Sequence, residues 1–159
     1  MNIDLIVIGD VKEKYLRDAI REYEKRLKPY ANLNTYELKE ARLSSNPSDK
    51  DIQLVLESEG QDILDKINPR AFVFALCIEG KEISSENLSE KISDINLEGL
   101  NDLVFIIGGS NGLSQEVKKR ADFKLSFSKM TFPHQLMRVI LLEQIYRAFK
   151  IMRNEPYHK

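Results

Sequence analysis

The chain has 159 residues and a formal net charge of −1, with 42% apolar and 31% charged side chains, so we expect one soluble globular domain over residues 1–159. Its single cysteine, Cys77, excludes a disulfide framework, and with only two histidines the chain lacks a metal-binding motif, so we expect no metal. The opening residues do not have the pattern of a signal peptide, and no apolar run approaches about 18 residues, which favours a reduced, cytoplasmic protein without a membrane segment.

Apolar runs alternate with helical patterns along the chain. In chain order they predict a strand over 3–8, a helix over 12–27, a strand over 32–38, a helix over 49–67, a strand over 71–78, a helix from 84 or 85 to 97, a strand over 103–107, a short helix over 114–120, a strand over 123–127 and a last helix over 133–152. Ser48 and Asp51 fit a capping box at the start of the second helix. The third and fourth strands are unbroken apolar sequence, as in strands covered on both faces. We therefore expect an α/β fold with a mostly parallel sheet flanked by helices.

A cluster of glycines directly follows the buried strand over 103–107. Gly108, Gly109 and Gly112 are three of the seven glycines in the chain. They fall at the carboxyl edge of the sheet, where open α/β sheets bind ligands and where glycine lets backbone amides approach closely. The spacing fits neither a P-loop nor a dinucleotide fingerprint. A ligand-binding loop and a tight strand-to-helix turn both explain this pattern.

The segment before the last helix, residues 126–135, combines two phenylalanines with hydroxyl groups, a lysine and a histidine. One interpretation is a loop in which Ser128 or Thr131 caps the helix and the phenylalanines are buried anchors. The other is a ligand site that offers backbone groups and aromatic faces to a nucleobase. His134 is accordingly either an ordinary helix-start residue or a catalytic group.

The last helix is more apolar than a surface helix needs to be. Between Leu136 and Met152, twelve of seventeen residues are apolar, whereas a stripe of roughly 100° suffices on a domain surface. Because charged residues such as Arg138 also lie on this helix, full burial within one small domain is unfavourable. A homodimer that covers one side of the helix is the favoured interpretation, and Ile145→Asp is expected to disrupt it.

Charge is distributed unevenly along the chain. Residues 117–159 carry ten Lys or Arg and three Asp or Glu, whereas residues 1–116 carry fourteen and twenty-two. A basic C-terminal quarter offers a polyanion such as RNA one attractive face, although solvated basic helices are also common at chain ends. The tail over 153–159 adds an aromatic ring and an imidazole to this region. It is therefore a candidate for gripping RNA or for completing an active site.

Several segments together resemble the SPOUT class of methyltransferases, and most closely the family of ribosomal RNA large subunit pseudouridine N3-methyltransferases that act on helix 69. The resemblance covers essentially the whole chain. It is carried by residues 6–9, 12–15, 22–27 and 59–60, and most specifically by residues 105–112, 125–135 and 156–159.

The resemblance implies a deep trefoil knot in the C-terminal part of the α/β fold, an obligate homodimer, and S-adenosylmethionine as a methyl donor that needs no metal. Three knot loops would hold the donor, and their positions correspond here to Leu76, Gly108, Phe127, Ser128, Lys129, Met130, Thr131 and Phe132. These positions follow the carboxyl ends of three predicted strands, where a ligand is also expected from the residues alone.

The implied reaction methylates N3 of a pseudouridine in 23S rRNA on the assembled ribosome. N3 lies between two carbonyl groups. Methyl transfer is therefore promoted by hydrogen-bond donors that stabilise negative charge on the two carbonyl oxygens, or by a base that removes the N3 proton. Arg153, His158 and Lys159 are candidate donors. Either His158 or Glu143 is a candidate base, and Tyr157 belongs with them in the catalytic tail. The tail of one subunit would lie over the donor site of the other.

Two other classes of function remain open. One is a related knotted enzyme that methylates a ribose 2′-hydroxyl of transfer RNA, although the tail shows no dedicated base for a hydroxyl group. The other is a non-catalytic ribosome-binding module with the same fold. Binding of the methyl donor would separate that module from both enzymes.

Overall fold

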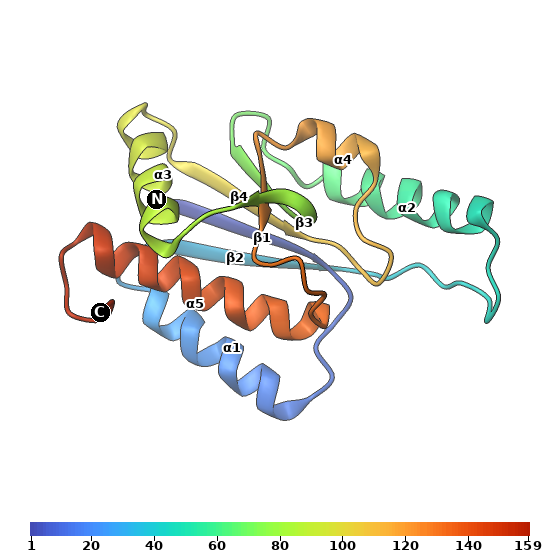
Figure 1. The fold of residues 1–159 in the computed structure, drawn as a ribbon, viewed down its shortest axis with the longest axis horizontal. Coiled ribbons are helices and arrows are strands. Elements are labelled where there is room, and N and C mark those ends of the chain that lie inside the picture. Colours follow the sequence, from blue (N-terminus) through green and yellow to red (C-terminus); the bar gives the residue numbers. More distant parts are fainter.

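Five parallel strands form a single sheet in the computed structural model, which describes residues 1–159 (Figure 1). The strands lie in the order β2-β1-β4-β3-β5, and every neighbouring pair is parallel. In chain order the elements are β1 (Asn2–Ile8), α1 (Lys14–Leu27), β2 (Asn32–Leu38), α2 (Asp49–Leu64), β3 (Phe72–Glu82), α3 (Ser85–Leu97), β4 (Asp102–Ile107), α4 (Gln115–Arg120), β5 (Phe123–Ser126) and α5 (His134–Met152). The predicted α/β class and parallel sheet are confirmed.

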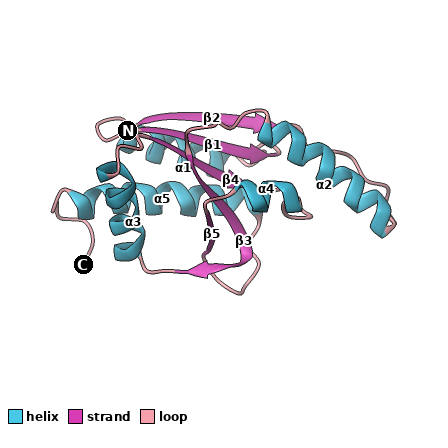
Figure 2. Cartoon of the chain, turned by 90° about the horizontal axis from the view of Figure 1, so that it is seen from above, coloured by secondary structure: helices cyan, strands magenta, loops and turns pink.

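Helices cover both faces of the sheet, so the central strands contribute to two different cores (Figure 2). On one face, α1, α3 and α5 pack over residues such as Leu5 and Phe105. On the other, α2 and α4 pack over residues such as Ile6 and Ile106. Successive side chains of a strand point to opposite faces, and here both faces are buried. This is why β4 is apolar from Leu103 to Ile107 rather than alternating with polar residues.

Phe105 lies in the larger of these two cores. Its ring stacks on that of Phe74, with centroids 4.6 Å apart, and both side chains are fully buried. Phe105→Ala should lower the free energy of unfolding by about 3–5 kcal/mol, because it removes a buried ring and leaves a cavity. Urea denaturation measures this change. Tyr15→Ala, at an exposed position, should change it by less than about 0.5 kcal/mol; equal losses in both variants would contradict the central place of Phe105.

The last helix, α5, lies between α1 and α3 with its inner side against the sheet (Figure 1). Its own domain buries Leu141, Leu142, Ile145, Ala148 and Phe149. Packing inside one chain therefore accounts for much of the apolar character that the sequence analysis assigns to a partner. A charge at Ile145 tests the core and not an interface, so Ile145→Asp is the wrong test of a dimer.

The outward side of α5 carries a second stripe of residues, spaced three or four apart: Leu136, Ile140, Glu143, Arg147 and Ile151. Leu136 is exposed, and the other four are half-buried. Only this outward stripe of α5 is available to a partner, because the other apolar residues of the helix are buried in their own domain or pack against its core. Neither α5 nor any other helix has the length and apolarity needed to cross a membrane.

β3 is longer than predicted and contacts β5 twice. The apolar run predicts an earlier end, but the strand continues to Glu82. Leu125 of β5 pairs with Leu76 and again with Lys81, and the register shifts between them. Gly80 lies where the two strands approach, because a Cβ there would be 2.7 Å from the carbonyl carbon of Leu125. A side chain at position 80 would push the strands apart.

The predicted helix caps are confirmed at α2 but not at α5. Ser48 and Asp51 form the capping box: the Asp51 amide donates to Ser48 Oγ at 3.2 Å, and the Ser48 amide donates to Asp51 Oδ2 at 2.8 Å. At α5 the N-cap residue is Pro133, and no side chain caps the helix. The prediction that Ser128 or Thr131 caps α5 is therefore wrong.

Candidate active site

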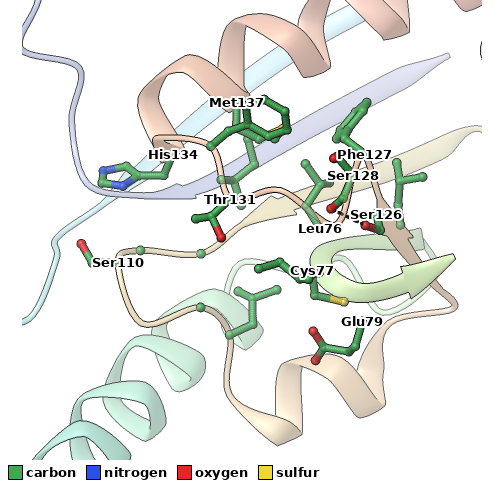
Figure 3. Close-up of a pocket in the computed structure, with 18 of the residues that line it drawn as sticks. Leu76, Cys77, Glu79, Ser110, Ser126, Phe127, Ser128, Thr131, His134 and Met137 are labelled. Atoms are coloured by element: carbon green, nitrogen blue, oxygen red, sulfur yellow. Dashed lines mark hydrogen bonds between the residues drawn. The ribbon is translucent and has the colours of Figure 1, made fainter. Parts of the chain in front are cut away.

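A cavity of about 610 Å³ lies at the carboxyl edge of the sheet (Figure 3). Three segments line it, namely residues 76–79 of β3, residues 107–113 after β4 and most of residues 125–134 after β5, together with Lys118 and Met137. They belong to three neighbouring strands, β4, β3 and β5, so their backbone groups converge on one space. The volume is within the usual range of about 300–1,000 Å³ for small-molecule sites.

Most of the residues predicted to hold a methyl donor border this cavity. Seven of the eight line it: Leu76, Gly108, Phe127, Ser128, Met130, Thr131 and Phe132. Lys129, the eighth, has an exposed side chain and is not part of the lining. The side chain of Lys129 is therefore not positioned to contact a molecule in the cavity.

The glycine loop after β4 is held in a narrow turn. Gly112 has a φ of +84°, and its amide donates to the carbonyl of Gly109 at 3.1 Å. A Cβ at Gly108 would lie 2.7 Å from the carbonyl carbon of Gly112, so a larger residue fits only if the loop opens. Both interpretations of the glycines apply: they form a tight turn, and that turn borders the cavity.

Glu40 holds the same loop from the side of β2. Its Oε1 accepts from the Ser110 hydroxyl at 2.9 Å and from the Ser110 amide at 3.3 Å. The next residue, Ala41, is held in turn because its amide donates to the buried Glu59 at 3.0 Å, and burial raises the pKa of Glu59. Sequence reasoning missed Glu40, because its contact with the glycine loop depends on the order of strands in the sheet.

Hydroxyl groups shape the loop after β5. Ser126 Oγ donates to the carbonyl of Ser128 at 3.1 Å, and Ser128 Oγ accepts from the Met130 amide at 3.0 Å. Phe127 and Phe132 are half-buried and line the cavity. The loop therefore presents aromatic faces and backbone groups to the cavity, as the ligand-site interpretation requires.

Four ionisable side chains line the cavity: Cys77, Glu79, Lys118 and His134. An ion pair with Lys118 lowers the pKa of Glu79, whereas burial raises the pKa of the Cys77 thiol. His134 lies at one end of the cavity beside Ser110, and Glu79 lies at the other (Figure 3). Sequence reasoning missed the Glu79–Lys118 pair because the two residues are far apart in the chain. Nowhere do three His, Cys, Asp or Glu side chains gather closely enough to hold a metal ion.

The tail residues predicted to be catalytic gather at the other end of α5. The Tyr157 hydroxyl donates to Glu143 Oε1 at 3.0 Å. The Tyr157 ring lies 4.9 Å from that of Tyr146 and 4.7 Å from the Arg147 guanidinium. Burial and the Glu143 carboxylate raise the pKa of Tyr157 to about 12. The phenol therefore stays protonated at neutral pH and acts as a donor.

His158 and Arg153 are held against the same protomer. His158 Nε2 lies 2.7 Å from Glu86 Oε1, and His158 Nδ1 lies 3.2 Å from Arg147 Nη1. The backbone amide of Glu86 and the His158 ring lower the pKa of Glu86 to about 2, so Glu86 is a carboxylate at neutral pH. The Arg153 guanidinium lies 4.5 Å from the centroid of the Tyr30 ring.

The tail and the cavity lie at opposite ends of one helix. α5 begins at His134, which lines the cavity, and ends at Met152, directly before the tail (Figure 1). With a rise of 1.5 Å per residue, the 19 residues of α5 separate the two regions by about 27 Å. The structure thus brings the predicted catalytic residues together with one another, but not with the predicted donor-binding residues of the same chain.

Many cations of the basic segment 117–159 are engaged inside the chain. Ion pairs join Lys118, Arg120, Arg138, Arg147 and Lys150 to Glu79, Asp122, Glu37, Glu143 and Glu155, respectively. The basic side chains that are exposed and form no ion pair are Lys119, Lys124, Lys129, Arg153 and Lys159. The positive charge offered to an RNA is therefore smaller than the count of basic residues indicates.

Comparisons with known proteins agree with this geometry. A family model described as "Predicted SPOUT methyltransferase" matches residues 1–158. A protein of Methanococcus maripaludis strain C5, named "Putative ribosomal RNA large subunit methyltransferase H", is 54% identical over 159 residues, which is the full length of both chains. The solved structure of a probable methylase family protein from Haemophilus influenzae Rd KW20 shares the fold, with a TM-score of 0.55 at 11% identity over 99% of this chain and 70% of that one. The resemblance found in the sequence is confirmed, and the chain belongs to the SPOUT methyltransferase family.

Proposed function

We propose that this methyltransferase acts on the RNA of the large ribosomal subunit, and that it methylates N3 of a pseudouridine in helix 69 of 23S rRNA on the assembled ribosome. The observation that carries the proposal is the full-length, 54% identity to a relative named as a ribosomal RNA large subunit methyltransferase. The nucleotide, its N3 atom and the helix rest on the sequence resemblance of residues 105–112, 125–135 and 156–159. A ribosomal substrate also implies a cytoplasmic enzyme.

S-adenosylmethionine fits the cavity as the methyl donor. The glycine loop brings backbone groups close to the cavity, and Phe127 and Phe132 offer flat apolar surfaces beside it. The sulfonium of this donor supplies an electrophilic methyl group that needs no metal. The chain itself binds the donor, orients it and keeps water away with apolar residues such as Leu76 and Met137.

A trefoil knot formed by the C-terminal half of the sheet is part of the proposal. Two features support it: β3 pairs with Leu125 of β5 at two separate positions, and Gly80 allows the backbones to approach where they meet. A segment that passes around β5 in this way would hold the three cavity loops together. The knot would thus hold the loops together in addition to the hydrogen bonds of Glu40, Ser126 and Ser128.

A homodimer that pairs through the outward stripe of α5 is the second structural part of the proposal. Leu136, Ile140 and Ile151 give this stripe apolar surface, and Arg147 and Glu143 neutralise each other at 2.6 Å. A paired charge is buried at much lower cost than a single one. If the two α5 helices lie antiparallel, the end of one reaches the start of the other. The tail of each protomer then lies beside the cavity of its partner.

A charge in the outward stripe should prevent this pairing. Ile140→Asp is expected to give a monomer that keeps its fold, because Ile140 is only half-buried in its own chain. Sedimentation at micromolar concentration measures the oligomeric state, and circular dichroism checks the fold. Leu54→Asp, on an exposed apolar residue of α2, is the matched control and should leave the dimer intact. A monomeric wild-type protein would rule out the dimer.

The tail residues would promote transfer by acting on the pseudouridine ring. Arg153, His158 and Lys159 supply donors for the two carbonyl oxygens next to N3, where negative charge develops. Glu143 is poorly placed to act as a base, because Arg147 and the Tyr157 hydroxyl donate to its Oε1. We therefore assign Glu143 to positioning the tail. His158 is retained as the candidate base, but it must first leave Arg147, which donates to its Nδ1, because its Nε2 then carries the proton shared with Glu86.

Transfer of a labelled methyl group to purified ribosomes tests the proposed function. We expect incorporation into 23S rRNA of assembled ribosomes and little into isolated rRNA, because a chain with a net charge of −1 has little overall attraction for naked RNA. Mass spectrometry of nuclease fragments locates the methyl group and separates N3 of pseudouridine from a ribose. A 2′-O-methyl group on transfer RNA would establish the alternative enzyme, and donor binding without any transfer would indicate a ribosome-binding module.

A further inference from the structure

An ion pair borders the cavity at the end away from His134. Glu79 of β3 and Lys118 of α4 both line the cavity and form this pair (Figure 3 shows Glu79). The Lys118 side chain is only 18% exposed, whereas that of Glu79 is 54% exposed. Placing an ammonium group in such a covered position is costly unless it has a charged partner. The donor loops and the tail leave this pair without a role.

The backbone around the pair is firmly placed. Gly80, next to Glu79, lies against the backbone of β5, where no side chain fits. On the other side, Val117 precedes Lys118 and is fully buried, and its amide donates to the capping Ser114 Oγ at 3.2 Å. The two charges are therefore presented to the cavity by segments that need not rearrange when a ligand binds, which lowers the cost of binding.

We propose that Glu79 and Lys118 bind the amino-acid end of the methyl donor, with Glu79 accepting from its ammonium group and Lys118 donating to its carboxylate. This inference rests on the proposed use of S-adenosylmethionine. The amino-acid end carries one positive and one negative charge, so the four groups alternate in sign around a ring. A lysine has three donors and a carboxylate has two acceptor oxygens, so each protein group keeps its present partner while it binds the ligand.

The rest of the lining favours this end of the cavity for the charged part of the ligand. No second pair of opposite charges lines the cavity, because the remaining ionisable residues there are Cys77 and His134. Elsewhere the lining consists of apolar side chains, hydroxyl groups and backbone, including Leu76, Phe127 and the glycine loop. Those surfaces match an adenosine group, which has no formal charge.

Two ligands that differ only at the amino-acid end test the inference. S-adenosylhomocysteine retains that end, whereas 5′-methylthioadenosine retains the adenosine and the sulfur but lacks it. By calorimetry, Glu79→Gln and Lys118→Met should each weaken S-adenosylhomocysteine about fivefold to tenfold, in keeping with charged hydrogen bonds at a partly exposed site. Both variants should bind 5′-methylthioadenosine within about twofold of the wild type.

Matched controls separate a ligand contact from a general change of charge. Lys119→Met removes a neighbouring cation of α4, and Glu82→Gln removes a carboxylate at the end of β3; neither residue lines the cavity. Both should leave the two affinities unchanged. The double swap Glu79→Lys with Lys118→Glu keeps an ion pair but exchanges its charges. We expect it to bind S-adenosylhomocysteine at least as weakly as the single variants, whereas a bridge with a merely structural role would be restored.

Each other outcome overturns the assignment. Equal weakening of both ligands would place the pair beside the adenosine or in the support of the cavity. Unchanged affinity for S-adenosylhomocysteine in the single variants, or full recovery in the double swap, would show that the pair does not read the amino-acid end. If the wild type binds neither ligand, the proposed function fails as well, and that result is distinct from a failure of this inference alone.

Discussion

Gly108→Ala should abolish binding of S-adenosylmethionine, with at least a hundredfold loss of affinity by calorimetry. The added Cβ would lie 2.7 Å from the carbonyl carbon of Gly112 and 3.0 Å from a methyl group of Leu113. The loop must open to admit it, and backbone atoms that border the cavity then move. Because a displacement of about 1 Å is enough to disrupt a positioned site, even this small substitution should have a large effect.

The fold should survive the same substitution. Ser110 to Gly112 are outside the two cores, and Leu113, at the edge of the smaller core, is the core residue that the added Cβ approaches, so circular dichroism should be unchanged and the temperature of unfolding should fall only slightly. Lys129→Ala is the matched control, since its side chain is exposed beside the same cavity and should not affect the affinity. Normal binding by Gly108→Ala would remove the cavity from the proposed donor site.

The sequence predicts best those strands that are buried on both faces of the sheet. β4 and the first half of β3 are covered by helices on both faces, so every position after Asp102 in β4 and every position from Phe72 to Leu76 in β3 is apolar, and the pattern is clear without knowledge of the partners. The second half of β3 escapes prediction, because Glu79, Lys81 and Glu82 are polar, and Lys81 and Glu82 pair with β5 rather than entering a core. Local pattern cannot show a pairing that a distant strand supplies.

The same reason explains the error at Ile145 and the missed residues of the site. Which residues of α5 are buried depends on the packing of α1 and α3 against it, and these two helices are distant from α5 in the sequence. Glu40 reaches the glycine loop, and Glu79 meets Lys118, only because the strands are ordered β2-β1-β4-β3-β5. By contrast, the donor-binding residues fall in loops that follow predicted strands, so their convergence at one edge is foreseeable.

Removing Tyr157 to Lys159 should reduce methyl transfer to ribosomes by at least a hundredfold and leave the affinity for S-adenosylmethionine unchanged. None of these residues lines the cavity, which lies about 27 Å away along α5. Instead they supply hydrogen-bond donors. One is the Tyr157 hydroxyl, which its pKa of about 12 keeps protonated, and the other is the His158 ring, which lies between Glu86 and Arg147. Wild-type transfer by the shortened chain would falsify the role of the tail and leave Arg147 as the alternative.

Mixing two inactive variants distinguishes a tail that acts on its own chain from one that acts on the partner. A Gly108→Ala chain has an intact tail but no donor site, and a chain without Tyr157 to Lys159 has the reverse. Because α5 separates the two regions within one protomer, a mixed dimer should contain one complete site, and its activity should approach half that of the wild type. Each variant alone should remain inactive. Sedimentation should show dimers in all three samples, namely the two single variants and their mixture. If the mixed dimer is also inactive, the antiparallel pairing of the α5 helices is wrong, because that pairing places the intact tail of one variant beside the intact cavity of the other.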